Sequence, residues 1–246
     1  MRILVIGGTR FIGPPTVRRL HARGHAIAIF HRGQSHADLP ADIQHITGDR
    51  KALADHAEAL RGFAPEIVLD MLPMTEQDAQ TVTQIFRGTA RRLVAISSQD
   101  VYRAYGRVNQ TEPGPPDPVP LDEDAPLRDK LYPFRGVIPD RDDYDKILVE
   151  RVVMGAPNLA GTILRLPMVY GPGDYQHRIY EYLKRMDDDR PAIIIPAEVA
   201  NWRWTRGDVE NVAEAIALTV TDDRAAGRIF NVGEPDALTI AEWVQA

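Results

Sequence analysis

Three glycines near the start of the chain stand where main-chain N–H groups could hold a diphosphate. The segment Gly7-Gly8-Thr9-Arg10-Phe11-Ile12-Gly13 follows an apolar run, Ile3–Ile6, and precedes an amphipathic stretch in which Val17 and Leu20 share a face. Glycine lets the backbone approach a pyrophosphate closely, and the free N–H groups at the start of a helix point toward the negative charge. Strand, glycine turn and helix in this order predict a dinucleotide site. The alternative is a tight turn without a ligand.

The residues that follow the next expected strands extend this predicted site. His31 and Arg32 come after a strand expected over Ala26–Phe30, where an NAD site usually carries an acidic residue for the ribose hydroxyls. A guanidinium suits a 2′-phosphate, so Arg32 favours NADP over NAD, and an ordinary surface arginine is the alternative. Residues after the third and fourth strands are expected to contact adenine or to line the cofactor channel: Asp49, Arg50, Asp70, Met71 and Leu72.

The composition excludes several classes of function. With 246 residues, 44% of them hydrophobic, the chain can bury a full core. A formal net charge of −6 and scattered cationic side chains argue against a general nucleic-acid surface. The absence of cysteine from the sequence excludes disulfides, thiol catalysis and cysteine-ligated zinc, and no metal site is expected. Apolar runs are only strand-sized, and a strand from Arg2 leaves no room for a signal peptide, so we expect no membrane partner and a cytoplasmic location.

Strands and helices alternate along the chain, which predicts an α/β fold of the Rossmann type, with a doubly wound parallel sheet and helices on both faces. Strands are expected over Ile3–Ile6, Ala26–Phe30, Ile43–Ile46, Glu66–Asp70, Arg92–Ile96, Gly161–Leu166 and Ala192–Ile195, and helices over Lys51–Arg61, Thr75–Arg87, Asp143–Met154, Ile179–Met186, Val209–Val220 and Ile240–Val244. Residues 1–170 are expected to form the NAD(P)-binding domain. Residues 171–246 are expected to form a small substrate-binding lobe, partly interleaved with that domain and truncated, because the chain stops within an apparent helix.

Six segments, in order along nearly the whole chain, resemble motifs of the extended short-chain dehydrogenase/reductases, the NAD-dependent epimerase/dehydratase family. They are Gly7–Gly13, Ser97–Tyr102, Asp122–Leu127, Lys146–Glu150, Leu164–Asp174 and Arg228–Gly233. The resemblance implies reversible oxidation at a sugar carbinol, giving epimerisation or dehydration of a nucleotide-linked sugar. It implies a small-molecule partner rather than nucleic acid and leaves a homodimer open. The cofactor residues it implies are Gly7, Thr9, Arg10, Phe11, Ile12, Gly13, Lys146, Pro167 and Val169.

The resemblance also assigns catalytic roles, with one departure. Enzymes of this family place a tyrosine and a lysine four residues apart on one helix, and a serine binds the substrate oxygen. The predicted catalytic residues are Ser98, Tyr144 and Lys146. However, Asp142 stands where the family has its tyrosine, and Tyr144 is only two residues before Lys146, which turns a regular helix by about 200° and separates the two side chains.

Three explanations of this departure stay open. Tyr144 could precede the helix, with Asp142 or Asp143 as its cap. Another tyrosine, Tyr132 or Tyr105, could enter from the loop instead. The proton-transfer role could also be lost, because an aspartate is ionised near neutral pH unless it is buried.

A second departure is Arg10, which stands where the family usually has its middle glycine. The arginine could reach a phosphate of the cofactor, including the extra phosphate of NADP. The same spelling, Gly7–Gly13, is similar to relatives that became chloroplast stem-loop RNA-binding proteins. The residues favour an enzyme, and a non-catalytic NAD(P)-binding or RNA-interacting protein of the same fold is the alternative.

Substrate contacts are expected after the fifth strand and in the lobe. The resemblance implies such contacts for Asp100 and Tyr102, and it implies that Arg203 or Arg206 holds the diphosphate of the nucleotide-linked sugar. Residues 109–140 contain eight prolines, which predicts an irregular loop over the mouth of the cleft.

Overall fold

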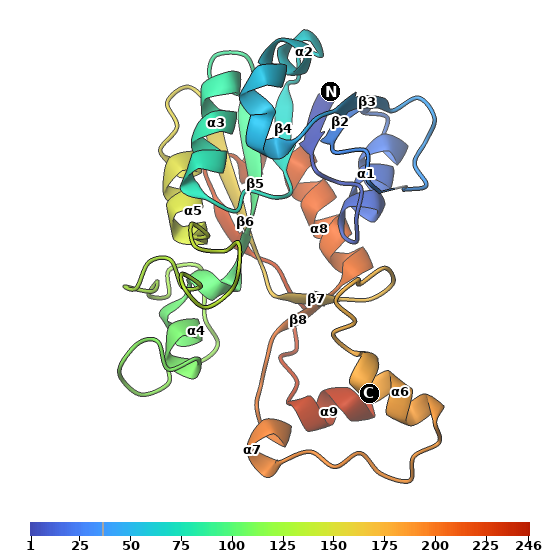
Figure 1. The fold of residues 1–246 in the computed structure, drawn as a ribbon, viewed down its shortest axis with the longest axis vertical. Helices are drawn as coiled ribbons and strands as arrows, with labels where there is room; N and C mark the ends of the chain where they lie inside the picture. The colour runs from blue at the N-terminus through green and yellow to red at the C-terminus, as the bar shows by residue number, and fades with distance from the viewer. Residues whose placement is uncertain (36) are drawn as a thin grey trace.

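Seven strands form one parallel sheet in this computed structural model, which describes residues 1–35 and 37–246. Along the sheet, the order is β3 (Gln44–Thr47), β2 (Ala26–His31), β1 (Arg2–Ile6), β4 (Ile67–Asp70), β5 (Arg92–Ser98), β6 (Ala160–Leu166) and β9 (Ile229–Asn231) (Figure 1). The chain runs outward from β1 to β3 and then restarts at β4 on the other side of β1. In a doubly wound sheet this reversal opens a crevice at the carboxyl ends of the strands. The predicted α/β fold with a doubly wound parallel sheet is confirmed.

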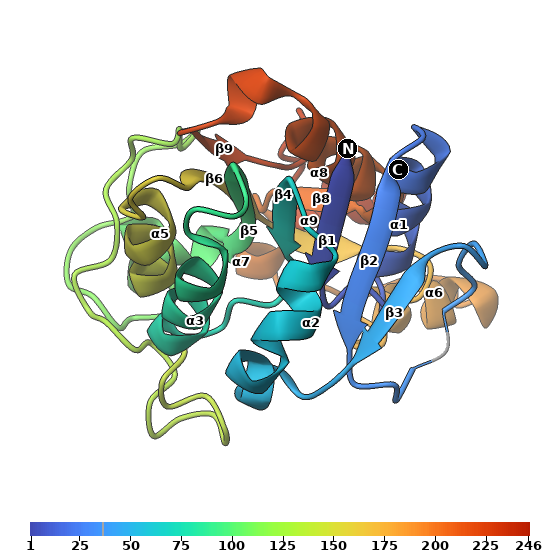
Figure 2. The ribbon, with the colours of Figure 1, turned by 90° about the horizontal axis from the view of Figure 1, so that it is seen from above.

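Helices cover both faces of the sheet because successive strand residues point in opposite directions. Ile3 and Val5 pack in the cluster that includes α1 (Gly13–Ala22) and α8 (Val209–Thr221). Leu4 and Ile6 pack in the cluster that includes α2 (Ala57–Gly62), α3 (Glu76–Phe86) and α5 (Lys146–Met154). Figure 2 shows the first pair of helices on one side of the strands and the other three on the opposite side.

Helix α8 comes from late in the chain but lies beside α1, the first helix. The apolar residues Val17 and Leu20 of α1 and Ile216 of α8 belong to the same buried cluster. Arg19 pairs with Glu210 at 2.7 Å across the two helices. The sheet domain is therefore completed by residues beyond 170, because α8 and β9 both return to it.

A smaller group of elements lies below the sheet in Figure 1. It contains the paired strands β7 (Met168–Tyr170) and β8 (Arg206–Asp208) and the helices α6 (Tyr180–Asp187), α7 (Ala197–Ala200) and α9 (Ile240–Gln245). Trp243 of α9 lies edge-on to the rings of Tyr170 and Tyr182, with centroids 5.5 and 6.0 Å away. The strand expected over Ala192–Ile195 is wrong: this segment is irregular, and Ile194 is 95% exposed, because no described strand lies alongside to pair with it.

Two expected helices begin or divide differently in the structure. The helix expected over Lys51–Arg61 is a 3-10 turn, η1 (Arg50–His56), followed by α2, because Ala52 has non-helical angles of φ −108° and ψ 24°. The helix expected from Asp143 begins at Lys146, so that expectation is also wrong. Its N-cap is Asp145, whose side chain accepts a hydrogen bond from the Ile147 N–H, and neither Asp142 nor Asp143 caps it.

The segment between β5 and α5 carries two short helical turns and a long irregular loop. The two turns are η2 (Gln99–Val101) and α4 (Arg103–Val108). Elsewhere in the chain, another short turn, η3 (Asp223–Ala225), precedes β9. Residues 109–140 form no helix or strand, in agreement with their proline content. Within the described residues, no helix is long and apolar enough to cross a membrane.

Candidate cofactor and active site

The glycine turn between β1 and α1 has a backbone that side chains would obstruct. Gly7 and Gly8 have φ values of +91° and +92°, a region that favours glycine. A Cβ on Gly13 would lie 2.4 Å from the Cα of Gly8, so the first turn of α1 rests directly on the loop. Within the described chain, no hydrogen bond takes up the main-chain N–H groups of residues 8–12. These N–H groups, in the turn that leads into α1, are therefore candidates to bind an anion.

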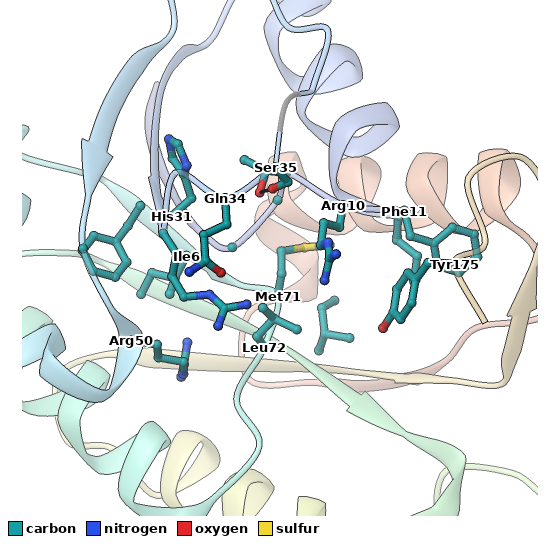
Figure 3. Close-up of a pocket in the computed structure, with 18 residues that line it drawn as sticks. Ile6, Arg10, Phe11, His31, Gln34, Ser35, Arg50, Met71, Leu72 and Tyr175 are labelled. Carbon is teal, nitrogen blue, oxygen red and sulfur yellow. Dashed lines mark hydrogen bonds between the residues drawn. The ribbon is translucent and has the colours of Figure 1, made fainter. Parts of the chain in front are cut away.

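A cavity of about 470 Å³ opens beside this turn, at the carboxyl ends of β1, β2 and β4. This volume lies in the ordinary range for sites that bind small molecules. Figure 3 shows Arg10 and Tyr175 at one end of the cavity and His31 and Arg50 at the other. The residues that line it are Ile6, Gly7, Gly8, Thr9, Arg10, Phe11, Ile12, Phe30, His31, Arg32, Gln34, Ser35, Gly48, Arg50, Met71, Leu72, Ile96 and Tyr175.

Ten of the residues predicted from the sequence to bind the cofactor line this cavity: Gly7, Thr9, Arg10, Phe11, Ile12, His31, Arg32, Arg50, Met71 and Leu72. Six others do not: Gly13, Asp49, Asp70, Lys146, Pro167 and Val169. Asp49 accepts a hydrogen bond from the Lys51 N–H and caps η1. Gly13 and Asp70 each contact a residue that lines the cavity. Gly13 packs against Gly8, and Asp70 accepts two hydrogen bonds from Arg50.

Eight lining residues lie outside the predicted cofactor set, and Gln34, Ser35 and Tyr175 are three of them. Ser35 exchanges a 2.7 Å hydrogen bond with Thr9, which ties the loop after β2 to the glycine turn. Tyr175 arrives from the segment after β7; its ring lies edge-on to Phe11 at 6.4 Å, and the Arg10 guanidinium lies 5.4 Å from its centre. Ser35 follows the Arg32-Gly33 turn and could have been included, but nothing local in the sequence marks Tyr175.

The charges around the cavity are divided between paired and free groups. Arg50 donates two hydrogen bonds of 2.7 Å to the buried Asp70 and lies 3.1 Å from Asp78, so its charge is compensated. Burial and the neighbouring His45 lower the pKa of His31, which keeps this imidazole neutral near pH 7. Arg10 and Arg32 are thus the lining side chains that offer positive charge to a phosphate.

A second group of polar side chains is linked to the cavity through Ile96, which lines it. The buried Lys146 donates hydrogen bonds to the carbonyl oxygens of Ile96 at 2.9 Å and Pro73 at 2.7 Å. Burial lowers the pKa of Lys146 to about 8, although nearby carboxylates oppose this shift. The Tyr144 hydroxyl donates a 2.7 Å hydrogen bond to Asp100, and the Tyr144 ring centre lies 5.9 Å from the Lys146 amine.

Tyr144 and Lys146 come together because the chain is extended between them. Asp145 has φ −160° and ψ 112°, and Tyr144 forms an isolated antiparallel bridge with Thr75. Side chains two residues apart point the same way along an extended chain, whereas a helix would turn them apart. The first of the three explanations, in which Tyr144 precedes the helix, agrees with this geometry.

The other two tyrosines differ from Tyr144 in their surroundings. Tyr132 lies under the Arg135 guanidinium, 3.8 Å from ring centre to carbon. Tyr105 is near the Asp100 carboxyl, and burial followed by this negative charge raises the Tyr105 pKa. Ser98 caps η2 by accepting a hydrogen bond from the Asp100 N–H at 3.2 Å.

The four residues predicted to contact substrate are all engaged within the protein. Tyr102 is buried, donates to Asn231 and accepts from Arg165, both at 2.8 Å. The buried Arg206 guanidinium lies 4.2 Å from the ring centre of Trp243. Arg203 donates to the Ala237 carbonyl at 2.7 Å, and Asp100 is only 7% exposed. Motif spacing gave no sign of these internal contacts.

We expect the buried Lys146 to make the free energy of unfolding increase with pH over an alkaline range. Between pH 8 and 10.5 the unfolded chain keeps the Lys146 proton that the folded protein has released, so the free energy of unfolding rises with pH, by up to about 3 kcal/mol. Lys146→Met removes this rise, and Lys51→Met, at an exposed position, keeps it. Urea unfolding at a series of pH values measures the slope; equal slopes in all three proteins would contradict a buried, readily neutralised amine.

The sequence matches the family described as the NAD dependent epimerase/dehydratase family over residues 3–233. A 3-diazoavenalumate denitrifying reductase from Streptomyces sp is 33% identical over 189 residues, which are 70% of this chain and 58% of that protein. Chloroplast stem-loop binding protein of 41 kDa b from Arabidopsis thaliana is 24% identical over 94% of this chain and 58% of that protein. The chain therefore spans less than two thirds of the length of these relatives.

Among solved structures, the fold is similar to that of UDP-glucose 4-epimerase from Thermus thermophilus, determined in complex with NAD. The TM-score is 0.72 at 21% sequence identity, and the match covers 100% of this chain and 81% of that one. At this identity the likeness establishes the shared fold.

Proposed function

The chain belongs to the NAD-dependent epimerase/dehydratase family, and we propose that it is an NAD(P)-dependent oxidoreductase acting on a carbinol or carbonyl carbon of a nucleotide-linked sugar. The observation that carries this proposal is that a polar cluster adjoins the cavity at Ile96. The glycine turn lines the cavity, and the main-chain N–H groups of residues 8–12 have no acceptor among the described residues. Tyr144 bonds to Asp100, and Lys146, which lies near the Tyr144 ring, donates to the carbonyl oxygen of Ile96. A nucleotide-binding protein that catalyses no reaction would need the cavity but not this cluster.

The residues present fit a pyridine dinucleotide. The N–H groups of residues 8–12 would hold the diphosphate, Arg32 would bind a 2′-phosphate, and Met71 and Leu72 would contact the rings. The bound coenzyme would supply the acceptor or donor of a hydride. Ser98 would hold the substrate oxygen and Tyr144 would exchange a proton with it. Residues 171–246 are proposed to recognise the rest of the substrate, beginning with Tyr175 at the cavity edge.

The protonated state of Tyr144 is the state that reduction of a carbonyl requires at this residue. Burial, and then the Asp100 charge, raise the pKa of Tyr144 well above its ordinary value, so the phenol keeps its proton at neutral pH. A protonated phenol can donate to a carbonyl oxygen as it gains charge. The similar Streptomyces protein is named a reductase, and we propose reduction as the activity to test first, with epimerisation or dehydration as alternative outcomes.

Coenzyme choice is tested by binding rather than turnover. We expect NADPH to bind more tightly than NADH, and Arg32→Ala to lose about tenfold in NADPH affinity while NADH affinity is unchanged, because only the former has a 2′-phosphate. Arg18→Ala is the matched control, since Arg18 is exposed on α1 and does not line the cavity. Calorimetric titration measures the affinities of the wild type and both variants for NADPH and NADH. Equal NADPH affinity in the wild type and Arg32→Ala would refute the assignment of Arg32.

The second candidate, an RNA-interacting protein, rests on the similarity to the Arabidopsis stem-loop binding protein. The experiment that separates the two candidates combines the purified chain with NADPH or NAD⁺ and a panel of nucleotide-linked sugars and ketosugars, with coenzyme absorbance as the readout. Consumption of coenzyme or conversion of a sugar supports the enzyme, because epimerisation and dehydration return the coenzyme to its starting state. Absence of both, together with salt-dependent retention of stem-loop RNA on a filter, would favour the RNA-interacting protein.

A further inference from the structure

The carboxyl group of Asp100 is buried at the junction of β5 and η2 with an incomplete set of hydrogen bonds. One oxygen, Oδ2, accepts the Tyr144 hydroxyl proton at 2.7 Å. The other, Oδ1, is shielded from solvent and has no hydrogen-bond partner among the described residues. A carboxylate can accept about four hydrogen bonds, so its charged form is poorly compensated here.

The charged groups around Asp100 are committed elsewhere. Arg128 donates to the main-chain oxygens of Asp100 and Lys130 and, at 3.3 Å, to Asp145. Lys146 donates to two main-chain carbonyls. Burial raises the pKa of Asp100 and Asp145 adds to the rise, whereas Tyr144, Arg128 and Lys146 oppose it. Tyr105 also faces this carboxyl. Within the described residues, Tyr144 is the side chain that bonds directly to the Asp100 carboxyl.

We propose that Asp100 is the positioning residue for Tyr144 and the group that takes up and returns its proton, so that Tyr144 and Asp100 form a two-step proton relay. The proposal rests on the proposed oxidoreductase function. In the oxidative direction, a bound pyridine nucleotide would be reduced by accepting a hydride, hydrogen with its bonding electron pair, from the carbinol carbon. The hydroxyl proton passes to Tyr144 Oη as the phenol proton passes to Asp100 Oδ2, and the carbon–oxygen double bond forms. Reduction reverses each transfer.

This relay answers a chemical difficulty that the geometry creates. A phenol with a raised pKa keeps its proton near neutral pH and so cannot accept another proton unless its own leaves. The Lys146 amine donates to carbonyl oxygens and does not bond to the Tyr144 hydroxyl. Asp100 is already hydrogen-bonded to the phenol oxygen, and burial raises the pKa of its carboxyl, which makes it a stronger base than an exposed aspartate.

The first test uses the protein without coenzyme and reads the Tyr144 proton directly. The near-ultraviolet signal of phenolate is followed against pH, and subtraction of the Tyr144→Phe titration isolates Tyr144. In Asp100→Asn, measured against its own Tyr144→Phe double variant, the Tyr144 midpoint falls by about one pH unit or more because a neutral amide replaces the charge. Asp143→Asn is the control, since Asp143 is exposed beside Tyr144 and pairs with Arg135. Equal midpoints in wild type and Asp100→Asn would overturn the proposal.

The second test measures one turnover with bound coenzyme and the best substrate of the panel. We expect Asp100→Asn to lower the rate of coenzyme oxidation or reduction by 100-fold or more while coenzyme affinity is unchanged. The fall in rate that the wild type shows at low pH should also disappear.

The wild type alone gives a further reading in mixtures of light and heavy water. If two protons move in the same step, the rate depends on the heavy-water fraction along a curve. A straight line, or a normal rate in Asp100→Asn while Tyr144→Phe is inactive, would overturn the relay but leave the proposed function standing. Absence of turnover in the wild type would count against the proposed function, and the coenzyme-free titration would still decide whether Asp100 and Tyr144 share a proton.

Discussion

Tyr144→Phe lowers the rate of the chemical step by about 10²- to 10⁴-fold, because it removes the hydroxyl that would exchange a proton with the substrate oxygen. The ring remains, so its contacts with Phe134, 5.1 Å between centroids, are kept. The Asp100 carboxyl loses its direct hydrogen bond, which costs about 1–2 kcal/mol of unfolding free energy. Single-turnover absorbance of the coenzyme and thermal melting of the same samples separate these two effects.

Two matched variants decide whether Tyr144 is the right tyrosine. Tyr132→Phe and Tyr105→Phe remove hydroxyl groups from the other two tyrosines that the sequence allowed. Both are expected to turn over within a few-fold of wild type. If either loses activity while Tyr144→Phe keeps it, the proton passes through that residue and the assignment of Tyr144 is wrong.

Gly13→Ala lowers coenzyme affinity by about 100-fold or more and the free energy of unfolding by about 3 kcal/mol. The added methyl group would lie 2.4 Å from the main-chain carbons of Gly8. Backbone packed on backbone cannot be relieved by a side-chain rotation, so α1 must move away from the glycine turn. That movement displaces the N–H groups of residues 8–12 from the anion they would bind.

Gly62→Ala provides the comparison for this change. Gly62 ends α2, and no atom lies within 4 Å of the position that its Cβ would occupy. We expect this variant to melt at or above the wild-type temperature, because alanine restricts the unfolded chain more than glycine does. Calorimetric titration with NADPH completes the pair; unchanged affinity in Gly13→Ala would show that the contact between the turn and α1 is not required for binding.

The order of the elements was predictable because apolar runs of strand length alternate with amphipathic helices. Ile3–Ile6 and the stripe Val82, Ile85 and Phe86 are examples in which periodicity and burial agree. Prediction failed where an apolar segment had no neighbouring strand to pair with, or where a different residue capped the helix. Ala192–Ile195 is apolar but has no neighbouring strand among the described residues, and Asp145, nearer to the helix than Asp142 or Asp143, takes the capping position.

The glycine turn and most of its cavity could be predicted, because both depend on residues adjacent to strand ends. Tyr175 could not be predicted as a lining residue, because it reaches the cavity from the segment after β7 and no periodic pattern in the sequence marks it. Tyr102 and Arg206 show the opposite case, in which a motif position suggested contact with substrate but the side chain is used internally. The partnership of Tyr144 with Lys146 depended on an extended backbone that residue spacing alone does not reveal.

The pairing of α1 with α8 also has a consequence for biosynthesis. During translation, Val17 and Leu20 emerge almost at once, but Ile216, which shares their buried cluster, is made roughly two hundred residues later. Until α8 is made, the nascent sheet leaves part of one apolar face exposed to solvent. Exposed apolar surface binds chaperones and promotes aggregation. The seven-stranded sheet therefore stays uncovered on this face until α8 has been synthesised, and we expect ribosome-bound chains stopped before α8 to be degraded by proteases that spare chains in which α8 is complete.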